Sequence, residues 1–385
     1  MRLALFFTRS GSLRDWIERG LFDREKLIYE RHLSEGTLKS IVWLTYGKDD
    51  GVLAEKMKKT GRLDPRIEVR GRPRWFPDGR LGGVVYSVVM PLLHFSALRR
   101  VDLLKTNQLD GGWAAVMARF LLRKPLLLRC GYVQSKLETT LRRLPPWRLH
   151  LMLALERFQY RHCDLAVVAS EHNARYIASN FAVPNSKIRI LPNYIDEVLF
   201  SPAKGADLQN RRERVLFVGR FSPEKNLEAL IRAANSLHLP LDLIGSGPQD
   251  AALGALISEL GADAHLLGTV PNSELPRLIN AYRYFALPSY FEGMPKALLE
   301  AMACGVVCIG SDVDGINEVI RDGVDGFLSK RTDPAALCEA IERARAADVG
   351  MVSVAARTKI IARYTLAAVA VYEKELFIEA HKLRG

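Results

Sequence analysis

The sequence has little that would place the chain in a membrane or outside the cell. Its longest nearly uncharged run, residues 84–98, contains Pro91 and His94 and is too short to span a bilayer comfortably. The apolar stretch near the start, residues 3–7, is too short for a secretory signal. We therefore expect a cytoplasmic protein. Residues 84–98 are interpreted as a buried strand or helix, with contact at a membrane interface as the alternative.

Cysteine is also scarce, and its spacing excludes two classes of protein. The five cysteines are Cys130, Cys163, Cys304, Cys308 and Cys338. They form neither a CxxC pair nor a Cys/His pattern typical of zinc sites. An odd number of scattered thiols is typical of a reducing compartment and argues against a disulfide-stabilised secreted domain.

The charge of the chain is distributed unevenly. Residues 1–200 contain 34 Lys and Arg against 20 Asp and Glu, a formal charge of +14. The remaining residues contain 21 against 23, a formal charge of −2. This asymmetry favours an anionic partner for the first half, such as a membrane surface, a phosphorylated lipid or a nucleic acid. A solvated basic surface without a partner is the alternative.

Length and periodicity predict two α/β domains. A chain of 385 residues, 48% of them hydrophobic, is too long for one ordinary core. Short apolar runs alternate with helical patterns, which is typical of parallel sheets covered by helices. The expected strands are residues 2–7, 40–45, 102–106, 125–129, 165–169 and 188–191, then 214–219, 241–244, 265–267, 284–287 and 306–310. The pattern breaks over residues 192–209, which places the domain boundary near residue 200.

Two cations follow the first strand of the second half. Arg220 comes directly after the strand at 214–219, and a Ser222-Pro223 break leads to Lys225 and a helical pattern. Ligands of open α/β sheets bind beyond the carboxyl ends of the strands. A guanidinium and an ammonium at such an edge suit a diphosphate. The alternative is that both are solvated charges beside a helix cap.

Two carboxylates flank the start of a later helix. Glu292 and Gly293 lie in a loop after a strand, Pro295 suits the first helical turn, and Glu300 falls on the helix. The main-chain amides of Gly293, Met294 and Lys296 would point outward there and bind phosphate oxygens or sugar hydroxyls. Carboxylates suit the hydroxyls of a ribose or a sugar ring. The alternative is one surface glutamate and one partly buried structural glutamate.

Together these motifs resemble the retaining glycosyltransferases of the GT-B fold, especially family 4. The segment Glu292-Gly-Met-Pro-Lys-Ala-Leu-Leu-Glu300 looks like the Glu-x7-Glu motif of that family. Other segments agree in the same order: Leu191-Pro-Asn-Tyr-Ile-Asp196, Gly219-Arg220 with Lys225-Asn226, Ile244-Gly-Ser-Gly-Pro248, Leu267-Gly-Thr-Val-Pro271, and a closing pattern that includes Gly305, Gly315 and Phe327. The resemblance is strong over about residues 190–330 and rests mainly on architecture before them.

The resemblance implies a fold and a division of labour. The fold is α/β, with two doubly wound Rossmann-like domains facing each other across a cleft. Residues 1–200 form the acceptor or membrane side, and a C-terminal helix of about residues 365–385 crosses back to them. Residues 201–364 form the domain that binds the nucleotide-sugar.

The resemblance also implies site residues. The catalytic residues would be Arg220, Lys225 and Glu292: the cations stabilise the donor diphosphate, and Glu292 contacts the transferred sugar. Glu300 would bind the ribose hydroxyls, and the backbone around Thr269 would meet the base. The donor-binding set comprises Arg220, Lys225, Thr269, Val270, Glu292, Gly293, Met294, Pro295, Lys296, Glu300 and Gly11. No metal and no cofactor is expected, because the two cations hold the diphosphate.

The first half departs from the family in two places. Its first strand-to-helix loop, Thr8-Arg-Ser-Gly-Ser12, has one glycine where many relatives have a pair. The segment Leu128-Arg-Cys-Gly-Tyr132 stands where many relatives have a histidine that contacts the donor sugar. Cys130 or a neighbour takes that place, or His94 substitutes for it, although a lone histidine in an apolar run is more often structural.

A basic and aromatic segment characterises the acceptor side. It consists of Arg142-Arg143, Pro145-Pro146-Trp147-Arg148 and a helical stretch over residues 149–158. Such a segment suits an anionic membrane surface. Packing of the helix against its own domain is the alternative.

The sequence thus predicts a retaining glycosyltransferase of the hexosyltransferase type. Its donor would be a nucleotide-diphosphate-sugar, by default a UDP-sugar, and its acceptor a saccharide or a lipid-linked glycan of cell-surface polysaccharide or glycoconjugate synthesis. We expect it in the cytoplasm, peripheral at the inner face of the membrane, with no nucleic-acid partner. The alternatives are a nucleotide-sugar epimerase or phosphorylase on the same scaffold, a basic nucleic-acid-binding protein, and a non-catalytic scaffold.

Overall fold

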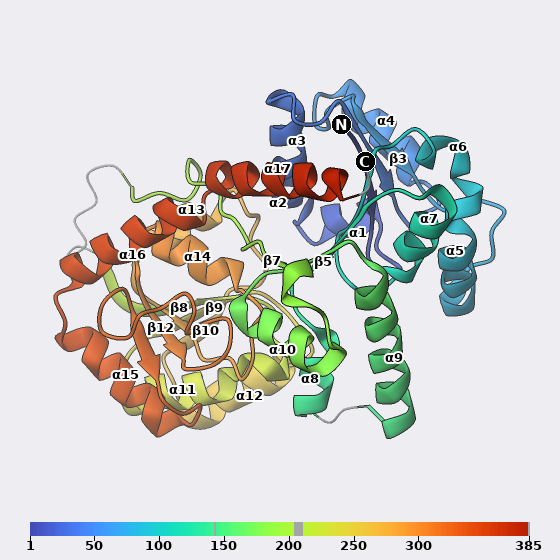
Figure 1. Cartoon of the computed structure of the whole chain (residues 1–385). Helices are drawn as coiled ribbons and strands as arrows, with labels where there is room; N and C mark the ends of the chain where they lie inside the picture. Colours follow the sequence, from blue (N-terminus) through green and yellow to red (C-terminus); the bar gives the residue numbers. More distant parts are fainter. Residues whose placement is uncertain (142–143, 204–210, 384–385) are drawn as a thin grey trace. The chain divides into compact units, whose positions relative to one another are not determined.

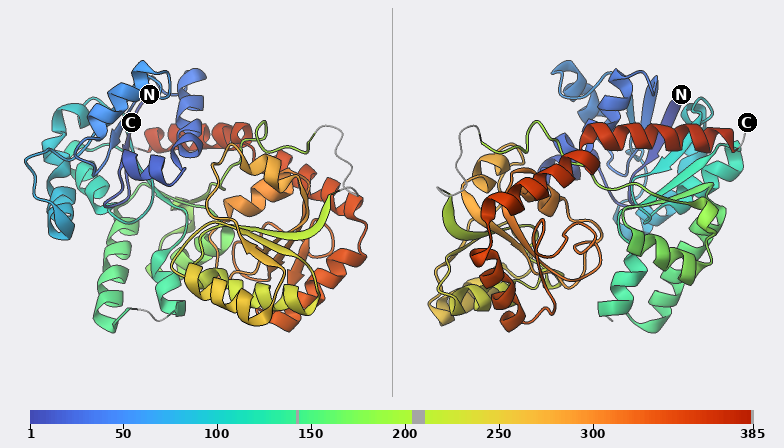
Figure 2. Two further views of the ribbon diagram at one scale, coloured as in Figure 1. Left: turned by 180° about the vertical axis from the view of Figure 1, so that it is seen from behind. Right: turned by 60° about the vertical axis from the view of Figure 1, so that its left-hand side comes forward.

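The computed structural model describes residues 1–141, 144–203 and 211–383, which form two compact units (Figure 1). The N-terminal unit comprises Met1–Leu191 with Ala370–Gly385, and the C-terminal unit comprises Pro192–Val369. Each unit contains one fully parallel sheet with helices on both of its faces (Figure 2). The predicted fold class, α/β with two doubly wound Rossmann-like domains, is confirmed.

The N-terminal sheet has seven strands in the order β3-β2-β1-β4-β5-β6-β7. The strands are β1 (Arg2–Phe6), β2 (Ser40–Leu44), β3 (Ile67–Arg70), β4 (Leu103–Thr106), β5 (Leu126–Cys130), β6 (Leu165–Val168) and β7 (Ile188–Ile190). The helices are α1 (Leu13–Glu18), α2 (Phe22–Glu25), α3 (Leu27–Ser34), α4 (Asp50–Lys59), α5 (Gly79–Leu93), α6 (Phe95–Leu98), α7 (Trp113–Leu122), α8 (Gln134–Leu141), α9 (Pro146–His162) and α10 (Glu171–Phe181). The strand order reverses between β1 and β4, and ligands of such sheets bind at this switch point.

The C-terminal sheet has six strands in the order β10-β9-β8-β11-β12-β13. They are β8 (Arg212–Val218), β9 (Leu241–Ile244), β10 (Ala264–Leu266), β11 (Tyr282–Leu287), β12 (Val307–Ser311) and β13 (Phe327–Ser329). The helices are α11 (Leu227–Ser236), α12 (Asp250–Leu260), α13 (Leu275–Ile279), α14 (Lys296–Ala303), α15 (Pro334–Ala346), α16 (Val349–Arg363) and α17 (Leu366–Lys382), whose residues from Ala370 onward belong to the N-terminal unit. Here the switch point lies between β8 and β11.

Burial explains why most strands were predictable and two were not. The inner strands are almost continuous apolar runs, because helices cover both faces of a parallel sheet. β3 and β13 are edge strands of four and three residues, and the sequence analysis missed both. In β3 the buried Ile67 and Val69 alternate with Glu68 and Arg70, which is too short a pattern to identify a strand.

The apolar segment at residues 84–98 forms most of α5 and all of α6. The helical interpretation is therefore right and the strand wrong, and the expected burial holds for one side only. Tyr86 and Met90 are buried in the core, whereas Val85 and Val88 are more than 40% exposed. A helix on a sheet buries one face, but the outer face of α5 is apolar as well. In the described part of the chain, no helix is long and apolar enough to cross a membrane.

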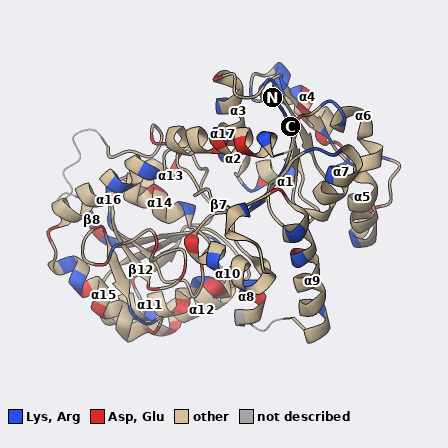
Figure 3. Cartoon of the chain, in the orientation of Figure 1, with Lys and Arg blue, Asp and Glu red and all other residues tan. Residues whose placement is uncertain are grey.

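A buried ionic cluster fastens α17 to the N-terminal unit. The Glu373 carboxylate accepts a hydrogen bond from Lys105 Nζ on β4 at 2.6 Å and lies 2.9 Å from His32 Nε2 on α3. All three side chains are at most 5% exposed. Figure 3 marks acidic residues along α17 in red. Glu373, which belongs to this helix, is buried.

Candidate functional site

Glycines join the strand ends of the C-terminal unit. Gly219, after β8, donates to the carbonyl of Ile244 at 2.9 Å, and Gly245, after β9, donates to the carbonyl of Gly268 at 2.8 Å. Gly245 has φ +143°, and a Cβ there would lie 1.8 Å from the Gly219 carbonyl oxygen. Only glycine fits so close a contact. The turn at residues 245–248 thus packs against the end of β8 and helps to fix the position of the loop that carries Arg220.

At the switch point, the loops after β8 and β11 meet through charged side chains. Lys225 Nζ donates to Glu292 Oε1, although the two residues are 67 positions apart in sequence. The Ser289 hydroxyl donates to the same carboxylate oxygen at 2.7 Å. Lys225 and Glu292 were predicted to serve the diphosphate and the sugar separately, and the structure places them in one hydrogen-bonded cluster.

Arg220 lies in the same loop after β8 as Lys225. It is the second residue after β8 and is exposed. Within the described ranges, no carboxylate forms an ion pair or hydrogen bond with its guanidinium. Taken together, Arg220, Lys225 and Glu292 carry a net charge of +1. An anion therefore finds a positive edge with one free guanidinium donor fork.

The start of α14 supplies further donors. Pro295 occupies the N-cap position without a side-chain hydrogen bond, and Lys296 is the first helical residue. Among the described residues, no main-chain carbonyl accepts from the amides of Gly293 or Met294. Amides at a helix start, together with the helix dipole, attract anions and hydroxyl oxygens. The predicted role of this segment is therefore chemically available to it.

Residues of the linking segment hold this loop in place. Asn193 Nδ2 donates to the carbonyl of Met294 at 2.7 Å, and the Lys296 ammonium lies 4.8 Å from the centre of the Tyr194 ring. Asn193 and Tyr194 matched the family by sequence, but their position against the loop was not predicted.

The remaining predicted donor-site residues are not part of the hydrogen-bonded cluster of Lys225 and Glu292. Glu300 is buried on α14, as expected for a residue on the helix. Thr269 is exposed and Val270 half-buried, in the loop that follows β10. Gly11 belongs to the N-terminal unit, in the turn after β1, where its amide donates to the Thr8 carbonyl at 2.8 Å. In the described part of the chain, no group of three or more His, Cys, Asp or Glu side chains is placed to hold a metal ion.

Sequence reasoning assigned no role to Asn226. It has φ 53° at the start of α11, and its side-chain amide donates to the carbonyls of Pro288 and Thr332. Asparagine tolerates this left-handed backbone better than most residues. The amide thereby connects the loops after β8, β11 and β13. The position of Asn226 directly before the first residue of α11 is the sequence feature that could have indicated this role.

Gly315 packs closely against the loop that carries Glu292 and Gly293. It has φ +81°, and a Cβ there would lie 2.6 Å from the carbonyl oxygens of both Glu292 and Gly293. We expect Gly315→Ala to shift this loop and to lower the free energy of unfolding by roughly 1–3 kcal/mol, because the added methyl group must displace backbone. Thermal unfolding and nucleotide binding would both report the change.

Gly323→Ala is the matched control for that substitution. Gly323 has φ +73°, but no atom lies within 4 Å of its added Cβ. A Gly323→Ala variant therefore has a strained backbone, as Gly315→Ala does, but its added methyl group contacts no neighbouring backbone. Equal losses of stability and of nucleotide binding in the two variants would show that the Gly315 contact does not matter.

The two candidates for the missing family histidine are both core residues. His94 is buried, and its Nε2 lies 2.9 Å from the Tyr86 hydroxyl; burial lowers the pKa of His94 to about 4. The Cys130 thiol is fully buried and points to the Tyr132 carbonyl, and burial raises its pKa to about 12. A neutral imidazole and an un-ionised thiol inside the core serve packing, so the interpretation of His94 as structural holds.

The predicted acceptor segment is only partly described. Arg142 and Arg143 lie outside the described residues. Pro146 begins α9, which includes the expected helical stretch over residues 149–158. Trp147 is 63% exposed, and the Arg148 guanidinium lies 5.0 Å from its ring centre.

Comparison with known families covers both units. The model of the Glycosyl transferases group 1 family matches residues 212–346, and that of Glycosyltransferase Family 4 matches residues 41–199. The amylovoran biosynthesis glycosyltransferase AmsK of Erwinia amylovora is 32% identical over 358 residues, which cover 88% of this chain and 83% of AmsK. The D-inositol 3-phosphate glycosyltransferase of Mycolicibacterium vanbaalenii is 31% identical over 50% of this chain, and the match spans about half (48%) of that relative's length.

Solved structures with the same fold cover nearly the whole chain. Sucrose-phosphate synthase from Thermosynechococcus elongatus superposes with a TM-score of 0.76 at 20% identity, over 98% of each chain. Anabaena Alr3699/HepE in complex with UDP and glucose superposes with a TM-score of 0.74 at 18% identity, over 97% of this chain and 98% of its own. At these identities the likeness shows a shared fold.

Proposed function

Since the chain belongs to the group 1 glycosyltransferases of family 4, we propose that it transfers a sugar from a nucleotide-diphosphate-sugar with retention of configuration. The fold and the enzyme class rest on that membership. The donor, the stereochemistry and the roles of individual residues are the proposal. The ion pair of Lys225 and Glu292, between the loops at the switch point of the C-terminal sheet, is the observation that carries it. Arg220 lies in the same loop as Lys225, and among the described residues its guanidinium has no ion-pair partner.

The charges of this site match the chemistry of the transfer. The bond between the anomeric carbon and the diphosphate oxygen breaks, and its electron pair stays on the phosphate. Arg220, Lys225 and the amides at the start of α14 stabilise the negative charge that develops there. The acceptor hydroxyl attacks from the same face, and its proton passes to the departing phosphate oxygen. Glu292 holds hydroxyls of the sugar, and Glu300 holds those of the ribose.

UDP is the proposed nucleotide. Alr3699/HepE carries UDP in its crystal structure and shares the fold of this chain over nearly its whole length. The base would meet the backbone at Thr269 and Val270, after β10. The acceptor is a saccharide or lipid-linked glycan of polysaccharide synthesis, since the relative that matches the greatest share of this chain among those named takes part in amylovoran biosynthesis. Neither an epimerase nor a nucleic-acid-binding protein is among the relatives named above.

Glu292→Gln tests separately whether the cluster of Lys225 and Glu292 serves UDP binding and whether it serves transfer of the sugar. We expect this variant to bind UDP at least as tightly as the wild type, because Lys225 no longer shares its charge with a carboxylate. Transfer should fall by about tenfold or more, because a charged hydrogen bond to the sugar is lost. Calorimetric titration with UDP and a transfer assay with the UDP-sugar measure the two effects. Glu259→Gln, an exposed glutamate on α12, is the matched control.

The opposite pattern would count against the proposal. If Glu292→Gln weakened UDP binding and left transfer unchanged, the carboxylate would not contact the sugar. Retention is tested separately by the anomeric coupling constant of the product in NMR, where an inverted linkage would exclude the proposed stereochemistry.

A further inference from the structure

Ser289 is a fully buried residue that contacts the carboxylate of Glu292. It is the second residue after β11, and none of its surface is exposed. Its hydroxyl donates to Glu292 Oε1 at 2.7 Å, and the same oxygen accepts from Lys225 Nζ. One carboxylate oxygen therefore has two donors, a short neutral side chain and a long charged one.

The main chain on both sides of Ser289 is held by the segment that joins β8 to α11. The carbonyl of Pro288 accepts from Asn226 Nδ2 at 3.1 Å, and the amide of Tyr290 donates to the carbonyl of Glu224 at 2.9 Å. A serine side chain has only one rotatable bond between its main chain and its oxygen. The fastened main chain therefore fixes where the Ser289 hydroxyl lies.

The other carboxylate oxygen of Glu292 remains available. Among the described residues, none donates a hydrogen bond to Oε2. This oxygen is also not fully enclosed, so a ligand can reach it. Because an oxygen of an ionised carboxylate is an acceptor only, Oε2 suits the hydroxyl of a sugar. The two donors on Oε1 thus leave Oε2 as the oxygen that accepts from a ligand.

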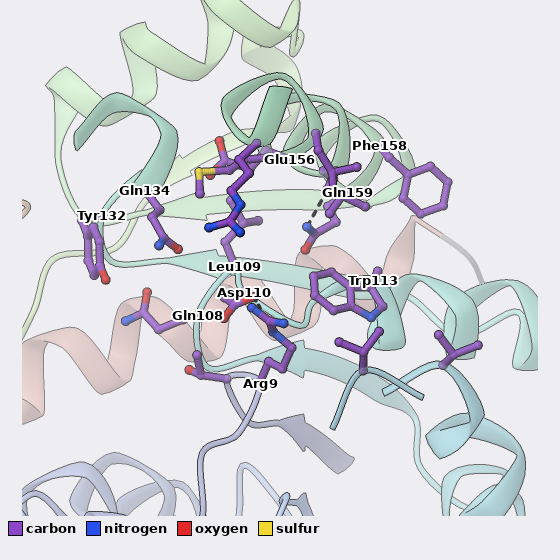
Figure 4. A pocket seen from close by; sticks show the side chains of 17 residues that line it. Arg9, Gln108, Leu109, Asp110, Trp113, Tyr132, Gln134, Glu156, Phe158 and Gln159 are labelled. Carbon is purple, nitrogen blue, oxygen red and sulfur yellow. Dashed lines mark hydrogen bonds and ion pairs between the residues drawn. The ribbon is translucent and has the colours of Figure 1, made fainter. Parts of the chain in front are cut away.

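A second buried pair of serine and glutamate shows what a hydroxyl alone provides. Ser135 donates to the Glu156 carboxyl group through its hydroxyl and its amide, and Glu156 lines a cavity of about 760 Å³ in the N-terminal unit (Figure 4). No described cation pairs with Glu156, and burial raises its pKa to about 7 although the hydrogen bonds from Ser135 oppose this shift. A hydroxyl therefore directs a buried carboxyl group without keeping it fully charged near neutral pH. At Glu292 the two tasks are divided: Lys225 supplies a neighbouring positive charge, and Ser289 supplies direction.

We propose that Ser289 is a positioning residue, which holds Glu292 in place while Lys225 binds the donor diphosphate. The diphosphate and Glu292 are both anions, so they compete for the Lys225 ammonium. The Ser289 hydroxyl is buried and neutral and takes no part in this competition. It keeps Oε1 in place and so presents Oε2 to a hydroxyl of the transferred sugar. The inference rests on the proposed function, and it assigns to Ser289 no contact with the donor itself.

Ser289→Ala in the full chain tests this role. We expect the variant to fold, because Oε1 of Glu292 still accepts from Lys225 and is not left unpaired. We expect kcat to fall about tenfold or more, since a misplaced group costs most in the transition state, and UDP affinity to stay within about threefold. Calorimetric titration with UDP measures the affinity. Release of UDP from UDP-glucose, UDP-galactose or UDP-N-acetylglucosamine, with water or an added saccharide as the acceptor, measures kcat and KM.

Two further variants separate the hydrogen bond from packing. Ser289→Cys fills nearly the same space, but a thiol is a weak donor. We expect its kcat to fall toward that of Ser289→Ala, whereas a packing role would leave it near the wild type. Ser329→Ala is the matched control, because this serine of β13 is 1% exposed and its hydroxyl donates to the carbonyl of Arg331 rather than to Glu292. It should keep kcat within about threefold of the wild type.

A double-mutant cycle with Glu292→Ala decides whether Ser289 acts through Glu292. A positioning residue has nothing left to position once the carboxylate is gone. Ser289→Ala should therefore cost about tenfold in the wild type but less than about threefold in Glu292→Ala. A general effect on the loop would cost the same factor in both backgrounds.

Three results would overturn the inference: a kcat of Ser289→Ala equal to that of the wild type, the same loss in both backgrounds of the cycle, or a Ser289→Cys variant as active as the wild type. If any of these occurs while the wild type binds UDP and releases it from a UDP-sugar, the role of Ser289 is wrong and the donor site stands. A wild type that releases UDP from none of these donors contradicts the proposed function, and the role of Ser289 is then wrong as well.

Discussion

Arg220→Ala is expected to lower kcat/KM for sugar transfer by roughly 2–4 kcal/mol, which corresponds to about 30- to 1,000-fold. Arg220 is the one of the three proposed catalytic side chains that has no partner in the described structure. Its guanidinium is therefore free to meet the phosphate on which charge develops. Loss of a preorganised donor at that point costs most in the transition state, so kcat should fall more than KM rises.

Arg277→Ala provides the control for this experiment. Arg277 is an exposed cation on α13 of the same unit, and its removal changes the net charge by the same amount. We expect it to leave kcat/KM within about threefold of the wild type. If Arg220→Ala also stayed within threefold, the guanidinium would have no part in catalysis.

Glu373→Ala is expected to lower the free energy of unfolding by about 3–5 kcal/mol. The substitution leaves the Lys105 ammonium buried without its carboxylate, and it removes the partner of His32 as well. A buried charge without a partner costs far more than a surface ion pair contributes. Urea unfolding followed by circular dichroism measures the change. Glu375→Ala, an exposed position on the same helix, should change stability by less than about 0.5 kcal/mol.

The same cluster predicts how stability depends on pH. Burial alone would raise the pKa of Glu373, but the Lys105 ammonium and His32 together lower it to about 2. A carboxyl group with a lowered folded-state pKa stabilises the fold above its unfolded pKa of about 4.5 and loses this contribution as the pH falls toward 2. We expect Glu373→Gln to lack this part of the acid dependence. A wild-type and a Gln variant with parallel stability curves from pH 5 to pH 2 would contradict the assignment.

Local sequence patterns were sufficient for the inner strands and for most helices. The apolar runs of β1, β2, β8 and β9 are buried on both faces, so their composition alone marks them. The edge strands β3 and β13 were not predicted, although β7 and β10, which are edge strands of three residues each, were. The exposure of the apolar outer face of α5 was not predicted either, because apolar residues on a helix are usually buried.

Contacts between distant parts of the sequence could not be predicted in the same way. The pair of Lys225 and Glu292 exists because β8 lies next to β11 in the sheet, and strand order is not written in either local motif. The resemblance to a family identified both residues but not their contact. Glu373 and Lys105 are 268 positions apart, and neither sequence context marks them as buried charges.

The position of the donor site in the C-terminal unit is the central claim, and nucleotide binding tests it most directly. The measurement is a thermal shift of the full chain with UDP, GDP, ADP and their common sugar conjugates, in wild type and in Arg220→Ala and Glu300→Ala. The account predicts that one nucleotide, UDP by proposal, stabilises the wild type by about 2.7 kcal/mol at 100 times its dissociation constant. Both variants should lose most of that gain. Two results would contradict the account: no nucleotide stabilises the wild type, or both variants respond as the wild type does. In either case Arg220 and Glu300 would not belong to a nucleotide-binding site.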